Sequence, residues 1–255
     1  MSPAVPSDPR WIVPEWPAPS HVRAVATTRR GGASLAPFDS FNLAMHVGDG
    51  PAAVAANRRA LVEALSLPRE PAWLEQVHGT TVVDAGTVGA PVPADASVAF
   101  GPETVCVAQT ADCLPVIFCS RSGDRVGAAH AGWRGLVDGV LEATIAALAC
   151  DPSELMAWLG PAIGPQAFEV GEEVREAFLA RDSGSAHCFA ANTRGRWMAD
   201  LYALARRRLA AAGVNAVFGG GLCTYTDADR FFSYRRDTRT GRMATLIWIS
   251  RSAGD

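Results

Sequence analysis

Three short apolar segments in the middle of the chain constrain its fold more than any other feature. VCVAQ at 105–109, VIFCS at 116–120 and RVGAAH at 125–130 are each bounded by residues typical of turns. Apolar runs of this length predict strands buried within a sheet. The TADCLP stretch between the first two contains Pro115, which is awkward in a central strand, so we expect a bulge or break there.

Helices are predicted among these strands without strict alternation. A stripe of apolar residues at helical spacing marks the first helix: Val54, Leu61, Val62 and Leu65. The last of the expected helices begins after Asp200, a favourable N-cap residue, and ends before Gly213. The expected helices cover 51–65, the segment from AGWRGL to about 149, 172–179 and 201–212.

The remaining elements are mostly strands. We expect one strand at 21–28, a strand, turn and strand over 72–83, a strand at MAWL, and a hairpin from RFFSYRRD to RMATLIWIS. This mixture predicts an α+β fold with mixed sheets and flanking helices rather than a doubly wound parallel sheet. We expect one domain at 21–255 after an extended N-terminal lead-in at 1–20.

The composition excludes several classes of protein. All 23 basic residues are arginine, so the chain lacks the lysine that Schiff-base, pyridoxal-phosphate, Walker-A and protein-kinase chemistries require. A net charge of −3 gives no reason to expect a nucleic-acid partner. No apolar run reaches the roughly 20 residues that a membrane helix needs. Six cysteines without regular spacing, and no signal-peptide pattern, favour reduced thiols in the cytoplasm.

Three polar residues stand where the predicted local structure breaks. His78 precedes Gly79, Cys113 precedes Leu114-Pro115, and His130 ends a strand just before a helix. A side chain at such a strand end points into the crevice where α/β sheets bind ligands, and Arg134 in the following helix could bind an anion. Each residue also has a structural interpretation, as a helix cap, a surface group or an inert core thiol.

The spacing of these three residues, 35 and 17 positions, matches no local zinc pattern. If they met, two imidazoles and a thiolate would form a three-ligand zinc site with an open fourth position, as in catalytic zinc. A Cys113 thiolate activated by His130 is the competing chemistry. We leave both open at this point.

The other candidate residues are weaker. Gln76 would share a strand face with His78, and His46 lies in a loop near Asn42. His21 and His187 are expected at the surface. The remaining cysteines give no argument for a site, and Cys106 and Cys119 are expected to be core residues.

Six segments in order resemble the YfiH-type family over roughly Val22 to Ile249. The segments are TTRRGGAS with PF and FNLAMHVGD, WLEQVHGTTV, ADCLPV, AAHAGWRG, LGPAIGP with FEVG, and FSYRRD with TGRMATLIWI. The family has been labelled laccase-domain polyphenol oxidase, purine nucleoside phosphorylase and peptidoglycan editing factor. The resemblance implies a single α+β domain with a metal-binding set of His78, Cys113 and His130.

The resemblance also implies an activity. It indicates a zinc-dependent phosphorylase of adenosine, inosine, guanosine and methylthioadenosine, with adenosine deaminase activity, in which His78, Cys113 and His130 are catalytic as well as metal ligands. Residues matching motif positions that line the pocket are Arg29, Asn42, His46 and Gln76, and Arg29 and Arg134 are candidates to hold phosphate. Asp95 or Asp112 could shuttle a proton in deamination.

Two other activities remain as alternatives. One is an editing hydrolase that removes a wrong amino acid from a muramyl peptide precursor, using the same residues. The other, copper-dependent polyphenol oxidation, is less favoured because five histidines cannot supply both a His₂Cys copper and a multinuclear cluster, although copper could bind at the same three residues. We expect small-molecule partners, nucleoside and phosphate, no nucleic acid or membrane partner, and a monomer or weak dimer.

Overall fold

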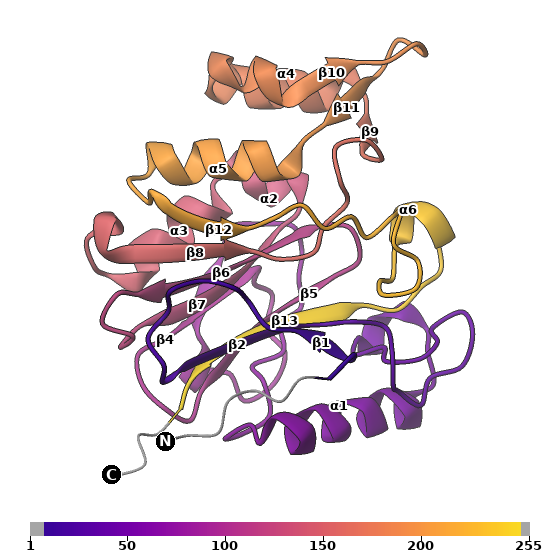
Figure 1. The fold of residues 1–255 in the computed structure, drawn as a ribbon, viewed down its shortest axis with the longest axis vertical. Coiled ribbons are helices and arrows are strands. Elements are labelled where there is room, and N and C mark those ends of the chain that lie inside the picture. Colours follow the sequence, from indigo (N-terminus) through magenta and orange to yellow (C-terminus); the bar gives the residue numbers. More distant parts are fainter. Residues whose placement is uncertain (1–7, 251–255) are drawn as a thin grey trace.

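The computed structural model describes residues 8–250, whose strands form three sheets (Figure 1). The expected lead-in is partly a strand, because β1 (Trp11–Ile12) pairs antiparallel with β2 (Val22–Thr27). The first seven residues of that lead-in lie outside the described residues. The chain is a single domain of the mixed α+β class, as the sequence predicts.

The largest sheet has six strands and carries both parallel and antiparallel pairs. Its outer pairs, β12 with β8 and β3 with β4, are parallel, and the central pairs are antiparallel. In spatial order the strands are β12 (Ala216–Gly219), β8 (Leu155–Leu159), β6 (Leu114–Ser120), β7 (Val126–Ala131), β4 (Ala96–Ala99) and β3 (Val82–Asp84).

Two smaller sheets complete the strand arrangement. The four-stranded sheet is wholly antiparallel and runs β1, β2, β13 (Met243–Ile249) and β5 (Val105–Thr110). The three-stranded sheet runs β10 (Phe189–Ala191), β11 (Trp197–Ala199) and β9 (Glu169–Val170).

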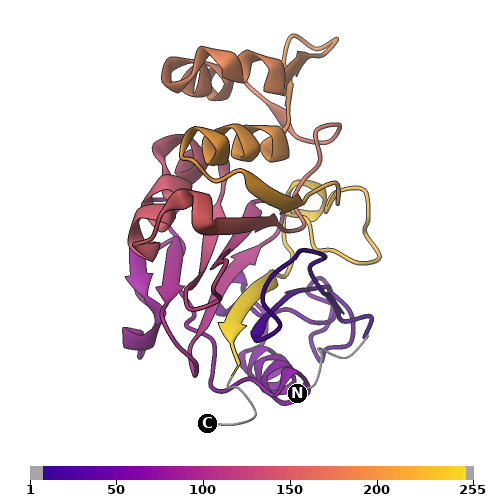
Figure 2. The same ribbon diagram turned by 60° about the vertical axis from the view of Figure 1, so that its left-hand side comes forward.

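The helices cover the outer faces of the two larger sheets. The α-helices are α1 (Pro51–Leu65), α2 (Trp133–Asp138), α3 (Val140–Leu148), α4 (Glu172–Arg181), α5 (Leu201–Ala211) and α6 (Tyr234–Asp237). Short 3₁₀ helices are η1 (Met45–Val47), η2 (Ala85–Thr87), η3 (Pro152–Glu154) and η4 (Ser183–Cys188). In both ribbon views α1 lies on one side of the sheets and α5 on the other, and α4 lies beyond α5 with the small sheet (Figures 1 and 2).

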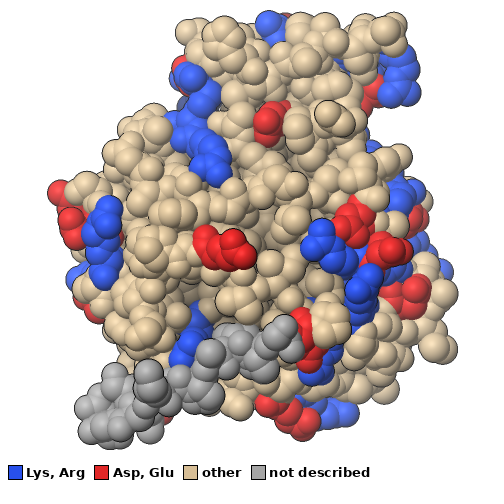
Figure 3. Space-filling view, viewed as in Figure 1, with Lys and Arg blue, Asp and Glu red and all other residues tan. Residues whose placement is uncertain are grey.

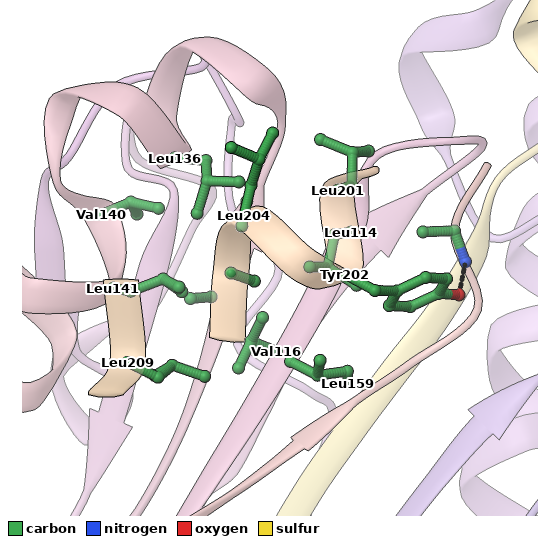
Figure 4. Packing of buried hydrophobic residues seen from close by; sticks show 14 of the residues in the cluster. Leu114, Val116, Leu136, Val140, Leu141, Leu159, Leu201, Tyr202, Leu204 and Leu209 are labelled. Atoms are coloured by element: carbon green, nitrogen blue, oxygen red, sulfur yellow. Dashed lines mark hydrogen bonds between the residues drawn. The ribbon is translucent and has the colours of Figure 1, made fainter. Parts of the chain in front are cut away.

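Buried side chains explain this layering. One cluster joins the facing sides of the two larger sheets and includes Ile117 and Ile247. A second packs α1 onto the four-stranded sheet, and a third packs α2, α3 and α5 onto the six-stranded sheet. Figure 4 shows the third cluster, where leucines of α5 meet Leu114 and Val116 of β6. Burial of this apolar surface is the main force that holds the layers together.

Several local predictions are confirmed, and three are wrong. The helices at 51–65, 172–181 and 201–211 lie where they were expected. The helix expected to reach 149 is divided by Gly139, whose φ of 106° belongs to the left-handed region. Of the two strands expected over 72–83, only the second is present, as β3 from Val82, and the first half of the segment is irregular apart from an isolated bridge at Glu75. The expected hairpin at the C-terminal end is absent from the described residues because β13 pairs with β2 and β5 instead.

The break expected at TADCLP is present, and it lies before Pro115. Residues 111–113 bend, with Asp112 at a φ of 89°, and β6 then starts at Leu114. Pro115 therefore belongs to the strand and pairs with His130. A proline is tolerated there because it stands at the beginning of β6, one residue before the pairing with β8 starts.

Candidate functional site

Three strands of the six-stranded sheet bring the candidate residues to one edge. Ala96 of β4 is opposite Ala129 of β7, so Asp95 lies beside His130 at the neighbouring position. His130 is in turn opposite Pro115 of β6, two residues after Cys113. His78 approaches from the irregular segment before β3. The ligand atoms of His78, Cys113 and His130 all lie within 4.8 Å of one another.

Asp95 organises this group from behind. It is buried, and its Oδ1 accepts hydrogen bonds from His130 Nδ1 at 2.8 Å and from the His78 backbone N–H at 3.0 Å. Its Oδ2 accepts from the backbone N–H groups of Gly79 at 2.6 Å and Val77 at 3.2 Å. The segment expected to be a strand therefore folds around this carboxylate, and His78 adopts a φ of 62° in the turn.

The Asp95 contact decides which histidine nitrogen is available. Because His130 Nδ1 is hydrogen-bonded to the carboxylate, Nε2 is the nitrogen that can face a metal. A carboxylate behind a ligating histidine fixes the orientation and tautomer of the ring and makes it a better ligand. The two imidazoles lie edge to face, with ring centroids 4.7 Å apart and planes at 65°.

The local charges shift the pKa values of these groups. Burial opposes the charge of His130, but the Cys113 sulfur and the Asp95 carboxylate outweigh it and raise the pKa of His130 to about 9. Burial, and then the neighbouring His130, lower the pKa of His78. Burial acts to raise the pKa of Asp95, yet the hydrogen bonds from His130, Gly79 and His78 lower it overall. Asp95 is thus held as a carboxylate.

Gly132 leaves the space in front of these ligands open. A Cβ at this position would lie 2.5 Å from His78 Nδ1 and 3.2 Å from Cys113 Sγ. The backbone of Gly132 has φ −60° and ψ 156°, a conformation that any residue can adopt. The glycine is therefore required here by space and not by backbone geometry.

The three residues line a cavity of about 540 Å³. Its apolar wall comes from distant parts of the chain: Trp133, Ile163, Phe168, Leu201 and Tyr234. Three arginines also line it, Arg134, Arg235 and Arg242, against a single carboxylate, that of Asp112. Basic side chains therefore outnumber acidic ones along the lining, whereas the whole chain carries a net charge of −3. On the face shown in Figure 3, by contrast, basic and acidic side chains are interspersed.

Three of the five residues expected to bind substrate line this cavity, namely His46, Gln76 and Arg134. His46 lies in η1, and Arg134 lies exposed at the start of α2 with its guanidinium 4.3 Å from the Trp133 ring centroid. Gln76 has a structural task, since its amide donates to Gln109 O at 2.8 Å and accepts from Gln109 N at 2.7 Å.

The other two, Arg29 and Asn42, are not among the lining residues. All three guanidinium nitrogens of Arg29 bind protein oxygens, those of Asp39 and Ala228. Asn42 is buried and hydrogen-bonded to Ala44, Asp49 and the backbone N–H of Arg242. Both residues hold loops in place, which a motif position alone does not reveal.

Several lining residues were missed by sequence reasoning. Arg242, Tyr234 and Arg235 come from the segment expected to be a hairpin, and Phe168 and Ile163 from around the turn after β8. The available signal was the arginine of TGRMATLIWI, a charge directly before an apolar strand. Its position beside the cavity depends on pairing of β13 with strands more than 100 residues away.

Asp112, a candidate proton shuttle, has partners for both oxygens. Oδ1 accepts from the Thr224 hydroxyl at 2.7 Å and Oδ2 from the Arg235 backbone N–H at 2.6 Å. It is the carboxylate that lines the cavity, while Asp95, the other candidate, lies behind the histidines. A buried carboxylate needs hydrogen-bond partners, and these two bonds supply them for Asp112.

Two histidine nitrogens and one thiolate sulfur fit zinc with an open fourth position, and copper also accepts these donors. The fit rests on three observations: convergence of the donors, the carboxylate behind His130, and the space left by Gly132. In the described part of the chain this is the one group of three such residues. A multinuclear copper cluster would need a further set of ligands.

Comparison with known proteins identifies the family of this chain. A family model described as multi-copper polyphenol oxidoreductase laccase matches residues 23–250. A protein of Escherichia coli named purine nucleoside phosphorylase YfiH is 55% identical over 239 residues, covering 93% of this chain and 98% of that protein. The chain belongs to the YfiH family. Another relative, a purine nucleoside phosphorylase of Pseudomonas aeruginosa, is 57% identical over 240 residues, covering 94% and 98%.

Solved structures of similar proteins share the YfiH fold. A crystal structure of a Neisseria meningitidis protein has a TM-score of 0.92 and 49% identity, covering 95% of this chain and 100% of that one. YlmD from Geobacillus stearothermophilus has a TM-score of 0.89 and 31% identity, covering 98% and 100%. Among the described residues, no helix combines the length and the apolar character needed to span a membrane.

Proposed function

We propose that this chain is a zinc-dependent purine nucleoside phosphorylase with His78, Cys113 and His130 at its reaction centre. The observation that carries the proposal is the convergence of these three donors within 4.8 Å at a cavity of about 540 Å³. A cavity of this size is within the usual range for small ligands. The names of the YfiH relatives support the choice of activity.

In phosphorolysis an oxygen of phosphate forms a bond to ribose C1′ as the bond from C1′ to the purine breaks. The purine leaves with the electron pair and takes up a proton, and ribose-1-phosphate is the second product. The aromatic and aliphatic wall of the cavity, with Phe168 and Ile163, suits a purine ring. Adenosine, inosine, guanosine and methylthioadenosine are the proposed substrates.

A zinc ion bound by the three residues would supply a Lewis acid with an open coordination position. His130 is oriented for this by Asp95, and Gly132 keeps space free in front of His78 and Cys113. Deamination of adenosine is a proposed side activity at the same centre, with Asp112 as the carboxylate on the cavity wall. Asp112 already accepts two hydrogen bonds, which must rearrange before it can transfer a proton. We therefore expect deamination to be slower than phosphorolysis.

The test begins with the metal content and activity of the purified protein. We expect about one zinc per chain, and conversion of adenosine plus phosphate to adenine and ribose-1-phosphate. Cys113→Ala and His130→Ala should remove both metal and activity. Cys150→Ala is a matched control, because Cys150 is a half-buried thiol outside the cavity lining.

Other outcomes would redirect the assignment. Full activity in both site variants would overturn the proposed centre. Full activity in metal-free protein would leave a Cys113 thiolate with His130 as its base. Activity on muramyl peptides but none on nucleosides would identify an editing hydrolase, and copper-dependent oxidation of phenols would identify an oxidoreductase.

A further inference from the structure

Arg242 lines the cavity but is neither a proposed metal ligand nor part of the apolar wall. It lies directly before β13, and its backbone is fixed on both sides. Its N–H donates to Asn42 Oδ1 at 2.9 Å, and its carbonyl accepts from the Leu43 N–H at 3.3 Å. The buried Asn42 therefore holds the arginine in register with the cavity wall.

The guanidinium of Arg242 is only partly satisfied by the protein. Nη1 donates to the carbonyls of Thr240 and Gly241, both at 3.0 Å. Within the described chain, Nε and Nη2 have no hydrogen-bond acceptor, and no carboxylate forms an ion pair with the group. The Tyr234 ring lies beneath it, with the ring centroid 5.8 Å from Cζ. One edge of the planar donor thus remains free.

This free edge belongs to a half-buried cation. Burial lowers the pKa of Arg242, and the nearby Cys113 and Asp112 counteract part of that effect. Arg242 also acts on His46: burial first, and then the charge of this arginine, lower the pKa of that histidine. Partial removal of a cation from water without a paired anion has a cost, and the free donors face a cavity, so this arrangement suits an anion supplied by a ligand.

The other arginines near the cavity differ from Arg242. Arg29 has all three guanidinium nitrogens bound to Asp39 or Ala228. Arg134 and Arg235 are exposed, and the Arg235 guanidinium donates to Glu169 O. Only Arg242 among these combines partial burial, a fixed backbone and unused donors.

We propose that Arg242 binds the phosphate co-substrate through the free edge of its guanidinium. Two parallel N–H groups match two oxygens of a phosphate, which gives both affinity and orientation. Because Arg242 lines the same cavity as His78, Cys113 and His130, a phosphate held there also lies in the cavity of the proposed reaction centre. This inference rests on the proposed phosphorolysis, in which that phosphate supplies the oxygen that attacks C1′.

The test compares Arg242→Gln and Arg242→Lys with wild type, all as zinc-loaded protein. We expect Arg242→Gln to raise the KM for phosphate about 10- to 100-fold, and to change the KM for the nucleoside less than about 3-fold. Arg242→Lys keeps the charge but loses the planar fork, so its KM for phosphate should be intermediate. Arg196→Gln, an exposed arginine in the turn between β10 and β11, is the matched control with the same change of charge.

Calorimetric titration with inorganic phosphate, in the absence of nucleoside, separates this inference from the proposed function. Binding in wild type that is lost in Arg242→Gln supports the inference, even if no nucleoside is cleaved. Phosphorolysis with an unchanged KM for phosphate in both Arg242 variants would overturn the inference and leave the proposed function standing. If Arg242→Gln unfolds, the same comparison is made with Arg242→Lys, for which unchanged phosphate binding and KM would overturn it.

Discussion

The Asp95 carboxylate lies 2.8 Å from His130 Nδ1 and also accepts hydrogen bonds from three successive backbone N–H groups, those of residues 77–79. One buried side chain therefore fixes both histidines of the candidate metal site. It orients His130 directly and His78 through the backbone turn. The geometry of the site depends on a residue that would not itself touch the metal.

Asp95→Asn should weaken zinc binding. The amide can accept through one atom only, so it cannot replace both carboxylate oxygens. Because it is neutral, it also no longer makes His130 a stronger ligand. We expect zinc affinity to fall about 10- to 100-fold, the usual effect of losing such a partner. Competition with a chelator measures this affinity. Asp138→Asn, at an exposed carboxylate in α2, is the control, and equal affinity in both variants would contradict the assigned role of Asp95.

Gly132→Ala should impair the metal site without straining the backbone. The new methyl group would intrude on His78 and Cys113, while φ and ψ remain favourable for alanine. We expect zinc affinity to fall at least about 10-fold, while the free energy of unfolding of the metal-free protein falls by no more than about 1–3 kcal/mol, the usual cost of overpacking.

Gly50→Ala is the matched control for that substitution. Gly50 is also a helix N-cap with an extended backbone, and a Cβ there would meet no atom within 4 Å. Zinc binding in this variant should equal that of wild type. A Gly132→Ala protein that binds zinc equally well would show that the open space is not needed.

The sequence predicts elements whose causes are local. The helix at 51–65 follows from its apolar stripe, and the helix from Leu201 follows from the Asp200 cap, whose side chain accepts from Ala203 N at 3.0 Å. The prediction of a C-terminal hairpin is wrong because β13 is an inner strand of its sheet and pairs with β2 and β5, which are distant in the sequence. The strand, turn and strand expected over 72–83 are not formed as predicted because the Asp95 carboxylate, rather than a partner strand, accepts the backbone N–H groups of residues 77–79.

In the candidate site, too, the sequence predicts what depends on local structure and does not predict what depends on long-range pairing. His78, Cys113 and His130 could be selected as unusual positions, but their spacing does not predict that they meet, which depends on the order of β4, β7 and β6. The resemblance to the YfiH family supplied that step. It did not distinguish Arg29, whose donors are all used within the protein, from Arg242, whose donors are not.

In metal-free protein, His130 should make stability depend on pH. Its pKa is about 9 in the folded chain and about 6.5 when unfolded, so its contribution is complete below pH 6.5 and is lost as pH rises through 9. The difference of about 2.5 pKa units sets an upper limit of roughly 3 kcal/mol on the loss. Denaturant unfolding at pH 6 and pH 9.5 measures it. The loss should be smaller in Cys113→Ala and absent in His130→Gln, and an equal loss in all three proteins would assign it to other groups.

Tyr202→Phe should destabilise the fold beside the cavity. The Tyr202 hydroxyl accepts from the buried Ala162 N–H at 2.9 Å (Figure 4). It also donates to Leu222 O at 2.6 Å, so it ties α5 to two loops. Phenylalanine would leave both backbone groups without this partner, at a cost of about 1–3 kcal/mol in the free energy of unfolding. Urea denaturation measures that cost, and Tyr225→Phe, at an exposed tyrosine, should change it by less than about 0.5 kcal/mol. An unchanged free energy of unfolding in Tyr202→Phe would show that water replaces the hydroxyl. Because Ile163 follows Ala162 and lines the cavity, the KM for nucleoside should also rise in this variant.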